Sequence, residues 1–396
     1  MSLQLSAATQ DRNINLMRHL LKKNGANVNE TDSNGKTPLM TAVWNDFLDV
    51  VEFLVKEAGA SVSLGDHEGR TPLYCAAFFN NPVIVRWLVD KGGADVDQAK
   101  NNGTTPLSTS SQEGHHEVVK LLLAKGANVD HVDNNGNTPL ILGSQYGHHE
   151  VMQLLLASGA TVDQVDSFGR TPLFMSSHNG HPEAVKQLLA NGADLNQADN
   201  DGATPLIISG QNGHREVVKL LLAKGAKVDQ AKNDGATPLF VSSMQGREEV
   251  VKLLLAHGAD VYQANNNGDT PLSMSTQNGH QEVVKLLMAR IATIRRFTVL
   301  SAIRQVRLVP PTPPPSQLLS LLANRTPDDV VRVILEFLGA QLELCGKCGK
   351  EAEKMQKCSG CKQVLYCSRE CQKQDWKEHK KSCKEAAARK EGGKGN

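Results

Sequence analysis

Apolar residues in the first three hundred positions come in short clusters, separated by turns rich in glycine and asparagine. The clusters recur with a fixed period, which the tripeptide Thr-Pro-Leu marks. It begins at Thr37, Thr71, Thr105, Thr138, Thr171, Thr204, Thr237 and Thr270, at spacings of 34, 34, 33, 33, 33, 33 and 33 residues. Eight copies in register predict an array in which each unit packs mainly on its neighbours.

Each repeat predicts two short helices joined by tight turns. An Asn-Gly pair such as Asn135-Gly136 suits a turn with positive φ. The threonine that follows is placed to cap a helix, and the proline takes the first helical position. This helix ends near a second glycine, such as Gly147. The second helix, for example over 116–123, has too many apolar residues for one narrow stripe, so it must pack on more than one side.

The whole unit, from Asn-Gly-x-Thr-Pro-Leu to Leu-Leu-x-x-Gly-Ala-x-Val-Asp, resembles the ankyrin repeat. The resemblance covers residues 1–297. It implies a mainly α solenoid of helix-turn-helix units with hairpin loops, made of a partial N-terminal cap and about eight repeats. The slot after Thr-Pro-Leu departs from the family, which commonly has histidine there. It holds Met40, Tyr74, Ser108, Ile141, Phe174, Ile207, Phe240 and Ser273, so we expect the hydrogen bonds of that histidine to be missing.

The resemblance also implies a protein-binding surface, because ankyrin repeats usually bind through their hairpin tips and the concave face of the first helices. The corresponding positions here are mostly polar amides. The aromatic exceptions are Trp44, Phe78, Phe79 and Tyr146. Large aromatic side chains on an open surface typically anchor interfaces, so we predict that a protein partner binds there. The alternative is that these rings pack between adjacent repeats.

Histidines that follow the second glycine recur once per repeat, which a metal or catalytic site would not require. They are His115, His148, His181, His214 and His280. We therefore predict that these histidines have a structural role, in packing or in helix capping. Cys75, in a first helix, is expected to be a buried, inert thiol.

Seven of the eight cysteines lie between 345 and 383. With one histidine they read Cys345-x2-Cys348-x9-Cys358-x2-Cys361-x5-Cys367-x3-Cys371-x7-His379-x3-Cys383. Eight soft ligands in four pairs predict two tetrahedral zinc sites with no open position, and closed sites of this kind are structural. The segment is too short for a sufficient core, so zinc would supply much of its folding free energy.

The same segment resembles the MYND finger closely, including Tyr366-Cys367-Ser368. By this resemblance, Cys345, Cys348, Cys367 and Cys371 hold the first zinc, and Cys358, Cys361, His379 and Cys383 hold the second. MYND fingers often bind Pro-x-Leu-x-Pro peptides, and Ser359, Gln372 and Trp376 match the positions of the family's groove. The alternatives are that Trp376 only packs the small core, or that the fold is a RING-type finger, whose ligand spacing fits less well.

Two further segments belong to neither family. Residues 298–344 form a Pro-rich and helical connector, with a stiff run at Pro310–Pro315 followed by a helix start at Thr326-Pro327. Residues 384–396 form a basic, flexible tail.

Composition narrows the function. The formal net charge of +1 gives no bias toward nucleic acid or membranes, and no apolar stretch is long enough to span a membrane. Without an export signal, the clustered cysteines indicate zinc in a reducing compartment, so an intracellular location, cytoplasmic and/or nuclear, is expected. The sequence contains no nucleophile elbow, Walker loop or dinucleotide fingerprint, which indicates that the protein is not an enzyme.

These observations predict a non-catalytic scaffold or adaptor whose partners are other proteins, including proline-containing peptides, with no small-molecule substrate. One protein would bind the concave face of the repeats and a Pro-rich peptide the finger. Two alternatives stay open: a substrate receptor of a ubiquitin ligase, docking through residues 316–340, and a nuclear transcriptional corepressor recruiter.

Overall fold

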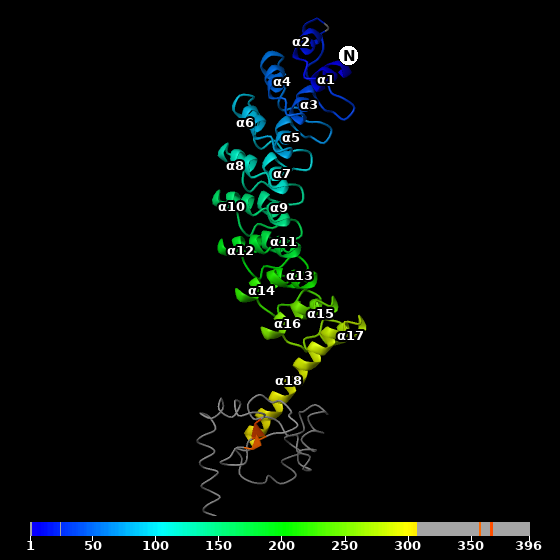
Figure 1. Cartoon of the computed structure of the whole chain (residues 1–396), viewed down its shortest axis with the longest axis vertical. Coiled ribbons are helices and arrows are strands. Elements are labelled where there is room, and N and C mark those ends of the chain that lie inside the picture. Colours follow the sequence, from blue (N-terminus) through cyan, green and yellow to red (C-terminus); the bar gives the residue numbers. More distant parts are fainter. Residues whose placement is uncertain (1, 24, 307–355, 358–364, 367–396) are drawn as a thin grey trace, which may run out of the picture. The chain divides into compact units, whose positions relative to one another are not determined.

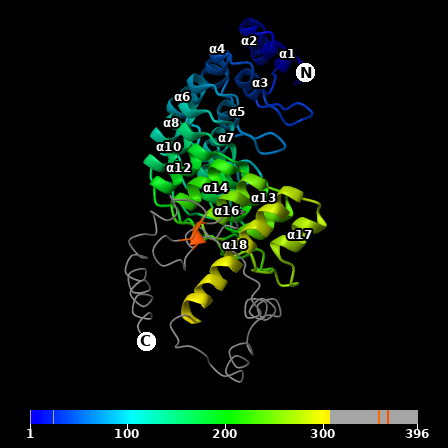
Figure 2. The ribbon, with the colours of Figure 1, turned by 60° about the horizontal axis from the view of Figure 1, so that its bottom comes forward.

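The computed structural model describes residues 2–23, 25–306, 356–357 and 365–366. The chain divides into two compact units, Met1–Leu287 and Met288–Asn396. In the first unit, inner helices stack in one row and outer helices in a second row beside it (Figure 1). Loops project from the inner row, on the side away from the outer helices (Figure 2). This arrangement is the helical solenoid that the period predicts.

The inner helices are α3 (Pro38–Trp44), α5 (Pro72–Phe78), α7 (Pro106–Glu113), α9 (Pro139–Tyr146), α11 (Pro172–Asn179), α13 (Pro205–Asn212), α15 (Pro238–Met244) and α17 (Pro271–Gln277). The outer helices are α4 (Leu48–Glu52), α6 (Pro82–Asp90), α8 (His116–Ala124), α10 (His149–Ala157), α12 (Pro182–Ala190), α14 (Arg215–Ala223), α16 (Glu248–Ala256) and α18 (Gln281–Val306). The helices α1 (Ser2–Gln10) and α2 (Ile14–Lys23) precede them, at the place of the predicted N-terminal cap, and bury Leu5, Ala8 and Met17.

Each inner helix begins as the sequence predicts. In α9 the Oγ1 atom of Thr138 accepts a hydrogen bond from the backbone N–H of Ile141 at 3.2 Å, and Pro139 takes the first turn, where no N–H is needed. The helix ends at Gly147, whose φ of 73° lies in the left-handed region. Each of the remaining inner helices also begins with a capping threonine and a proline in its first turn. This shared start keeps the repeats in register.

Two repeats are one residue longer than the others, and both absorb the extra residue at the end of the outer helix. In the first, α4 continues as a π-helix over Phe53–Glu57, and the N–H of Ala58 donates to the carbonyl of Phe53. In the second, the N–H of Gly92 donates to the carbonyl of Trp87, again five residues back. The insertion therefore stays local, and the next inner helix begins in its usual place.

The slot after Thr-Pro-Leu builds the core between inner helices. Ile141, Phe174, Ile207 and Phe240 are buried in one cluster that runs through four consecutive repeats. An apolar row thus occupies the positions where the family commonly has histidine. The capping threonines keep their hydrogen bonds, so this departure leaves the helix starts unchanged.

The recurring histidines link each repeat to the one before it. Their Nε2 atoms lie 2.8–3.1 Å from backbone carbonyl oxygens, pairing His115 with Phe78, His148 with Gln112, His181 with Gln145, His214 with His178 and His280 with Met244. A carbonyl only accepts, so Nε2 must carry the proton. In the repeat that lacks the histidine, Nε of Arg247 donates to the carbonyl of Gln211 at 3.0 Å. The predicted structural role of these side chains is confirmed.

The predicted end of the array at residue 297 falls within the last outer helix. The helix α18 runs on to Val306. Nothing between Arg290 and Val306 stops it, because that stretch contains neither glycine nor proline. In the second unit, the strands β1 (Gln356–Lys357) and β2 (Leu365–Tyr366) pair antiparallel, with Lys357 opposite Leu365. No helix within the described residues is long and apolar enough to cross a membrane.

Neighbouring serines on the inner helices differ in their hydrogen bonding. Oγ of Ser176 donates to the carbonyl of Leu173 at 3.1 Å. Oγ of Ser177, which is also fully buried, has no partner among the described residues. The equivalent hydroxyls of Ser111, Ser144 and Ser243 are in the same situation. A buried hydroxyl without a hydrogen-bond partner lowers the free energy of unfolding. Replacing these serines by alanine should therefore stabilise the protein.

We predict that Ser177→Ala raises the free energy of unfolding by about 1 kcal/mol, because alanine removes an unsatisfied hydroxyl and favours helix. Ser176→Ala, one residue away in α11, is the matched control and should gain less, since it loses a hydrogen bond. Urea denaturation followed by circular dichroism measures both. A Ser177→Ala variant less stable than Ser176→Ala would show that the Ser177 hydroxyl has a partner.

A second prediction compares two glycines of the same repeat. A Cβ at Gly143, inside α9, would make ordinary contact with Met152 Cγ at 3.5 Å. Gly143→Ala should therefore stabilise the protein by roughly 0.5–1 kcal/mol. A Cβ at Gly147 would lie 2.6 Å from His181 Nδ1, and its φ is positive. Gly147→Ala should cost about 2 kcal/mol or more, by backbone strain and by disturbing the link of His181. Equal urea midpoints for the two variants would contradict this account.

Candidate functional site

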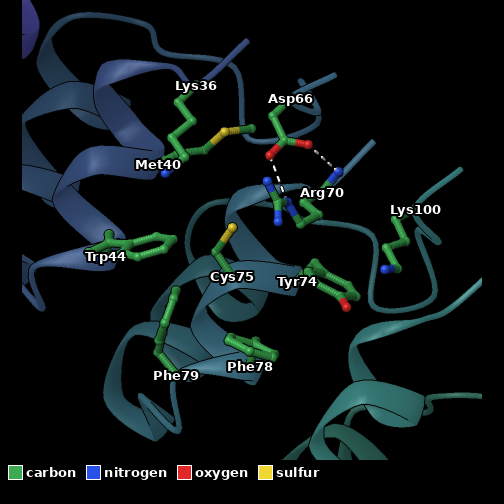
Figure 3. A pocket seen from close by; sticks show the side chains of 10 residues that line it. All are labelled: Lys36, Met40, Trp44, Asp66, Arg70, Tyr74, Cys75, Phe78, Phe79 and Lys100. Atoms are coloured by element: carbon green, nitrogen blue, oxygen red, sulfur yellow. Dashed lines mark hydrogen bonds and ion pairs between the residues drawn. The ribbon is translucent and has the colours of Figure 1, made fainter. Parts of the chain in front are cut away.

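A pocket of about 170 Å³ opens on the face formed by the inner helices and loops of the first repeats. It is lined by Lys36, Met40, Trp44, Asp66, Arg70, Tyr74, Cys75, Phe78, Phe79 and Lys100 (Figure 3). These residues come from α3, from α5 and its C-terminal end, and from the loops that precede α3, α5 and α7, the first three inner helices. Residues up to 64 positions apart in sequence thus meet through the stacking of adjacent repeats.

The structure brings together three of the four aromatic residues that the sequence singles out. The ring centroids of Trp44 and Phe79 lie 4.3 Å apart across two adjacent repeats, and those of Phe78 and Phe79 lie 5.0 Å apart. Trp44 nevertheless keeps 50% of its surface exposed and Phe78 keeps 40%. The rings therefore pack between repeats, as the alternative expected, and also present apolar surface to solvent.

Tyr146, the fourth aromatic residue, does not take part in the pocket. It lies at the end of α9, is 48% exposed, and stacks on the ring of His148 at 6.2 Å. Its assignment to a binding surface stays a prediction.

Two charged residues of the pocket, Asp66 and Arg70, form an ion pair. Oδ2 of Asp66 accepts a hydrogen bond from Nε of Arg70 at 2.7 Å, and Oδ1 accepts from the backbone N–H groups of Glu68 and Arg70. The Asp66 side chain is almost fully buried. Lys36 and Lys100 instead lie over aromatic rings, with Nζ 4.0 Å from the Trp44 centroid and 5.5 Å from the Tyr74 centroid. The two lysines remain as positive charge at the pocket.

Cys75 lies in the pocket wall and is only 7% exposed. Burial, together with the negative charge of Asp66, raises the pKa of the Cys75 thiol to about 12. At neutral pH the group is therefore a neutral, apolar part of the wall and not a nucleophile.

The charged residues of this site do not stand out in the sequence. Lys36 and Arg70 each directly precede a Thr-Pro-Leu, and Lys100 takes the place that Asp66 has in the preceding repeat. Aligning the repeats shows these positions at the base of successive hairpins. Because the base of one hairpin stacks directly on the base of the next, equivalent positions in adjacent repeats are neighbours in space. The alignment of the repeats could therefore have indicated that these charged residues lie together.

The predicted zinc ligands Cys345, Cys348, Cys358, Cys361, Cys367, Cys371, His379 and Cys383 lie outside the described residues, as do the groove positions Ser359, Gln372 and Trp376 and the segment 316–340. The described strands bear on the zinc sites through their order in the chain. β1 ends directly before Cys358 and β2 ends directly before Cys367, and the two strands pair. Two of the predicted ligands, Cys358 and Cys367, thus directly follow the paired strands in the chain.

In the part of the chain that the structure describes, no three His, Cys, Asp or Glu side chains gather as a metal site would require. The five recurring histidines instead donate hydrogen bonds to carbonyl oxygens of the preceding repeat.

Family models match two regions of the chain. A model of ankyrin repeats matches residues 5–100, 92–166, 145–232 and 225–297, and a model of the MYND finger matches residues 345–383. The chain belongs to the ankyrin-repeat family and carries a C-terminal MYND finger. Both are protein-interaction modules and typically non-catalytic, and a MYND finger is a zinc-binding domain, which supports zinc as the metal. The predicted fold class is confirmed.

Curated relatives of the SET-domain class are similar to this chain over the finger region only. SET domain-containing protein 14 of Caenorhabditis elegans is 38% identical over 64 residues, which is 15% of each chain. SET domain and MYND-type zinc finger protein 6 of Schizosaccharomyces pombe is 47% identical over 49 residues, 12% of this chain and 10% of that protein. Human histone-lysine N-methyltransferase SMYD3 is 41% identical over 46 residues, 12% of this chain and 11% of that protein. The chain thus spans no more than 15% of these relatives.

Among solved structures, the human ASB11 ankyrin repeat domain superposes with a TM-score of 0.52 at 28% sequence identity. The match covers 56% of this chain and 98% of that one. This similarity extends over a large part of the repeat array and supports its solenoid architecture.

The raised pKa of Cys75 leads to a prediction about alkylation. With a pKa of about 12, roughly one thiol in ten thousand is ionised at pH 8, so iodoacetamide should label Cys75 at least about a hundredfold more slowly in the native protein than in urea. The native rate should also rise about tenfold per pH unit from pH 8 to pH 10. Peptide mass mapping separates Cys75 from the other cysteines. A native rate that levels off near pH 9 would contradict the account.

Proposed function

We propose that this protein is a non-catalytic scaffold that binds one protein at the pocket of its first repeats and a second through its MYND finger. The observation that carries the proposal is the half-exposed aromatic cluster of Trp44 and Phe78 beside a preformed pocket. Aromatic side chains in pockets typically supply most of the binding free energy of an interface. The same residues also hold two repeats together, so the site needs little ordering when a partner binds.

The remainder of the concave face supports the N-terminal end as the strongest binding region. The ends of the later inner helices carry polar residues such as Gln112, Asn179 and Gln245. Polar amides of this kind favour contact with water or weak polar interfaces. The pocket combines apolar walls with unpaired positive charge, which the amide-rich positions do not offer.

For the finger, we propose two structural zinc ions held by the eight predicted ligands, with Ser359, Gln372 and Trp376 forming the groove for a proline-containing peptide. The indole of Trp376 would offer a flat apolar surface for proline rings. With all coordination positions taken by protein ligands, neither zinc could activate water. Two binding ends on one chain would raise the effective concentration of one partner near the other.

Relatives that carry SET-domain or methyltransferase names match only the finger region, and at most 15% of this chain. The remainder of the chain has a different match, to ankyrin repeats, over residues 5–297. The similarity therefore supports a shared finger and gives no support to methyltransferase activity.

The proposal predicts two separable sets of bound proteins. Full-length tagged protein, supplied with zinc, is used for affinity capture from a cell lysate with quantitative mass spectrometry. Trp44→Ala with Phe78→Ala should remove one set, by loss of the apolar anchors, at least about tenfold. Trp376→Ala should remove the other set.

Tyr262→Ala provides the control, because Tyr262 is 49% exposed and lies far along the array from the pocket. It should change neither set. Circular dichroism melting checks that all variants remain folded. If the Trp44 and Phe78 variant captures every protein that the unchanged chain captures, the pocket is not a binding site; if Trp376→Ala changes nothing, the groove assignment fails.

A further inference from the structure

The pocket is shaped for side chains and not for a cofactor. Its volume of about 170 Å³ is below the range of roughly 300–1,000 Å³ that small-molecule sites occupy. Met40, Tyr74 and Cys75 form an apolar inner wall, and the thiol of Cys75 lies between Trp44 and Tyr74 (Figure 3). One or two apolar side chains of a partner would fill this space and be removed from water.

Positive charge lies on two opposite sides of this apolar space. Lys36 and Lys100 lie on opposite sides of the pocket lining (Figure 3). Each ammonium group lies near the face of an aromatic ring, Trp44 or Tyr74. Among the residues that the structure describes, neither lysine makes an ion pair, although fourteen other ion pairs of lysine or arginine with a carboxylate are present. Both ammonium groups therefore remain available to an incoming anion.

The acids of the site do not offset this charge for a partner. Asp66 is buried and already accepts three hydrogen bonds, from Arg70 Nε and two backbone N–H groups. Glu68, at the exposed end of the same loop, lies 3.4 Å from Arg70. Both carboxylates are thus directed to one guanidinium, and no described carboxylate reaches either lysine.

Aromatic pockets often bind cations over the faces of their rings. Here those faces are already occupied, because Lys36 lies over Trp44 and Lys100 lies over Tyr74. A cationic guest would have to displace an ammonium group and would be repelled by it. The arrangement therefore excludes a methylated lysine or an arginine as the preferred guest, and favours an anion.

We infer that the partner of this pocket is an acidic peptide segment, in which an apolar side chain enters between the aromatic rings and flanking carboxylates pair with Lys36 and Lys100. This inference rests on the proposed function, because it names the chemistry of the partner that the pocket binds. On binding, each ammonium group moves from a ring face to a carboxylate, and the ring then covers the apolar side chain. Two lysine–carboxylate pairs at the edge of an apolar site favour acidic peptides over neutral or basic ones. The affinity for such peptides should fall as the salt concentration rises.

The test uses an array of 12-residue peptides, each with a central Leu, Phe or Trp and random flanks, probed with the full-length protein and zinc. Peptides whose binding disappears in the Trp44→Ala, Phe78→Ala variant are taken as pocket ligands, which separates them from ligands of the finger. We expect these peptides to be enriched in Asp and Glu on both sides of the apolar residue. Their Kd, measured by fluorescence polarisation, should rise about tenfold when every Glu is replaced by Gln.

Lys36→Gln with Lys100→Gln should weaken the same peptides about tenfold and flatten their dependence on salt. The matched control is Lys120→Gln with Lys219→Gln, which removes the same charge from the exposed outer helices α8 and α14 and should have no effect. Pocket ligands with basic flanks, or a selection that yields no pocket ligand, would overturn the inference. Pocket ligands without acidic residues, insensitive to both lysine substitutions, would overturn it while leaving the proposed function intact.

Discussion

Every repeat of this chain leaves one side of its helix pair uncovered, and only the next repeat can cover it. This constraint explains most of the invariant positions of the period. The histidine after each glycine reaches back to a carbonyl of the preceding repeat, for example His181 to Gln145 at 3.1 Å. The glycine before it has to lack a side chain, because the ring of the following repeat's histidine lies where its Cβ would be. Register between repeats is thus fixed by contacts that recur once per unit.

The same constraint creates the candidate site. Pocket residues from three successive repeats meet only because the repeats stack in register. The rings of Trp44 and Phe79 belong to different repeats and pack at 4.3 Å, so the binding surface is part of an inter-repeat interface. Stability and binding therefore depend on the same side chains at this end of the array. The lysines differ, because within the described residues neither makes an ion pair and their ammonium groups lie over ring faces, which makes their charge available for recognition.

Much of the fold could be predicted from the sequence, since its determinants are local. Thr138 and Pro139 begin a helix and Gly147 ends it, and the structure confirms all three roles. Features that depend on packing between repeats could not be predicted in this way. The cluster of Ile141 and Phe174 fills a slot that had been described only by a missing histidine. The aromatic anchors were recognisable as unusual residues, whereas Lys36 and Lys100 look like ordinary surface lysines until the repeats are stacked.

The most direct measurement of the central claim is hydrogen–deuterium exchange of the full-length protein, free and bound to a protein that it captures. The account predicts slower amide exchange on binding in α3, in α5 and in the loops around Asp66 and Lys100. Exchange in the outer helices α8, α10, α12 and α14 should not change. Slower exchange confined to the outer helices, with none at the pocket, would contradict the claim that the first repeats form the binding site.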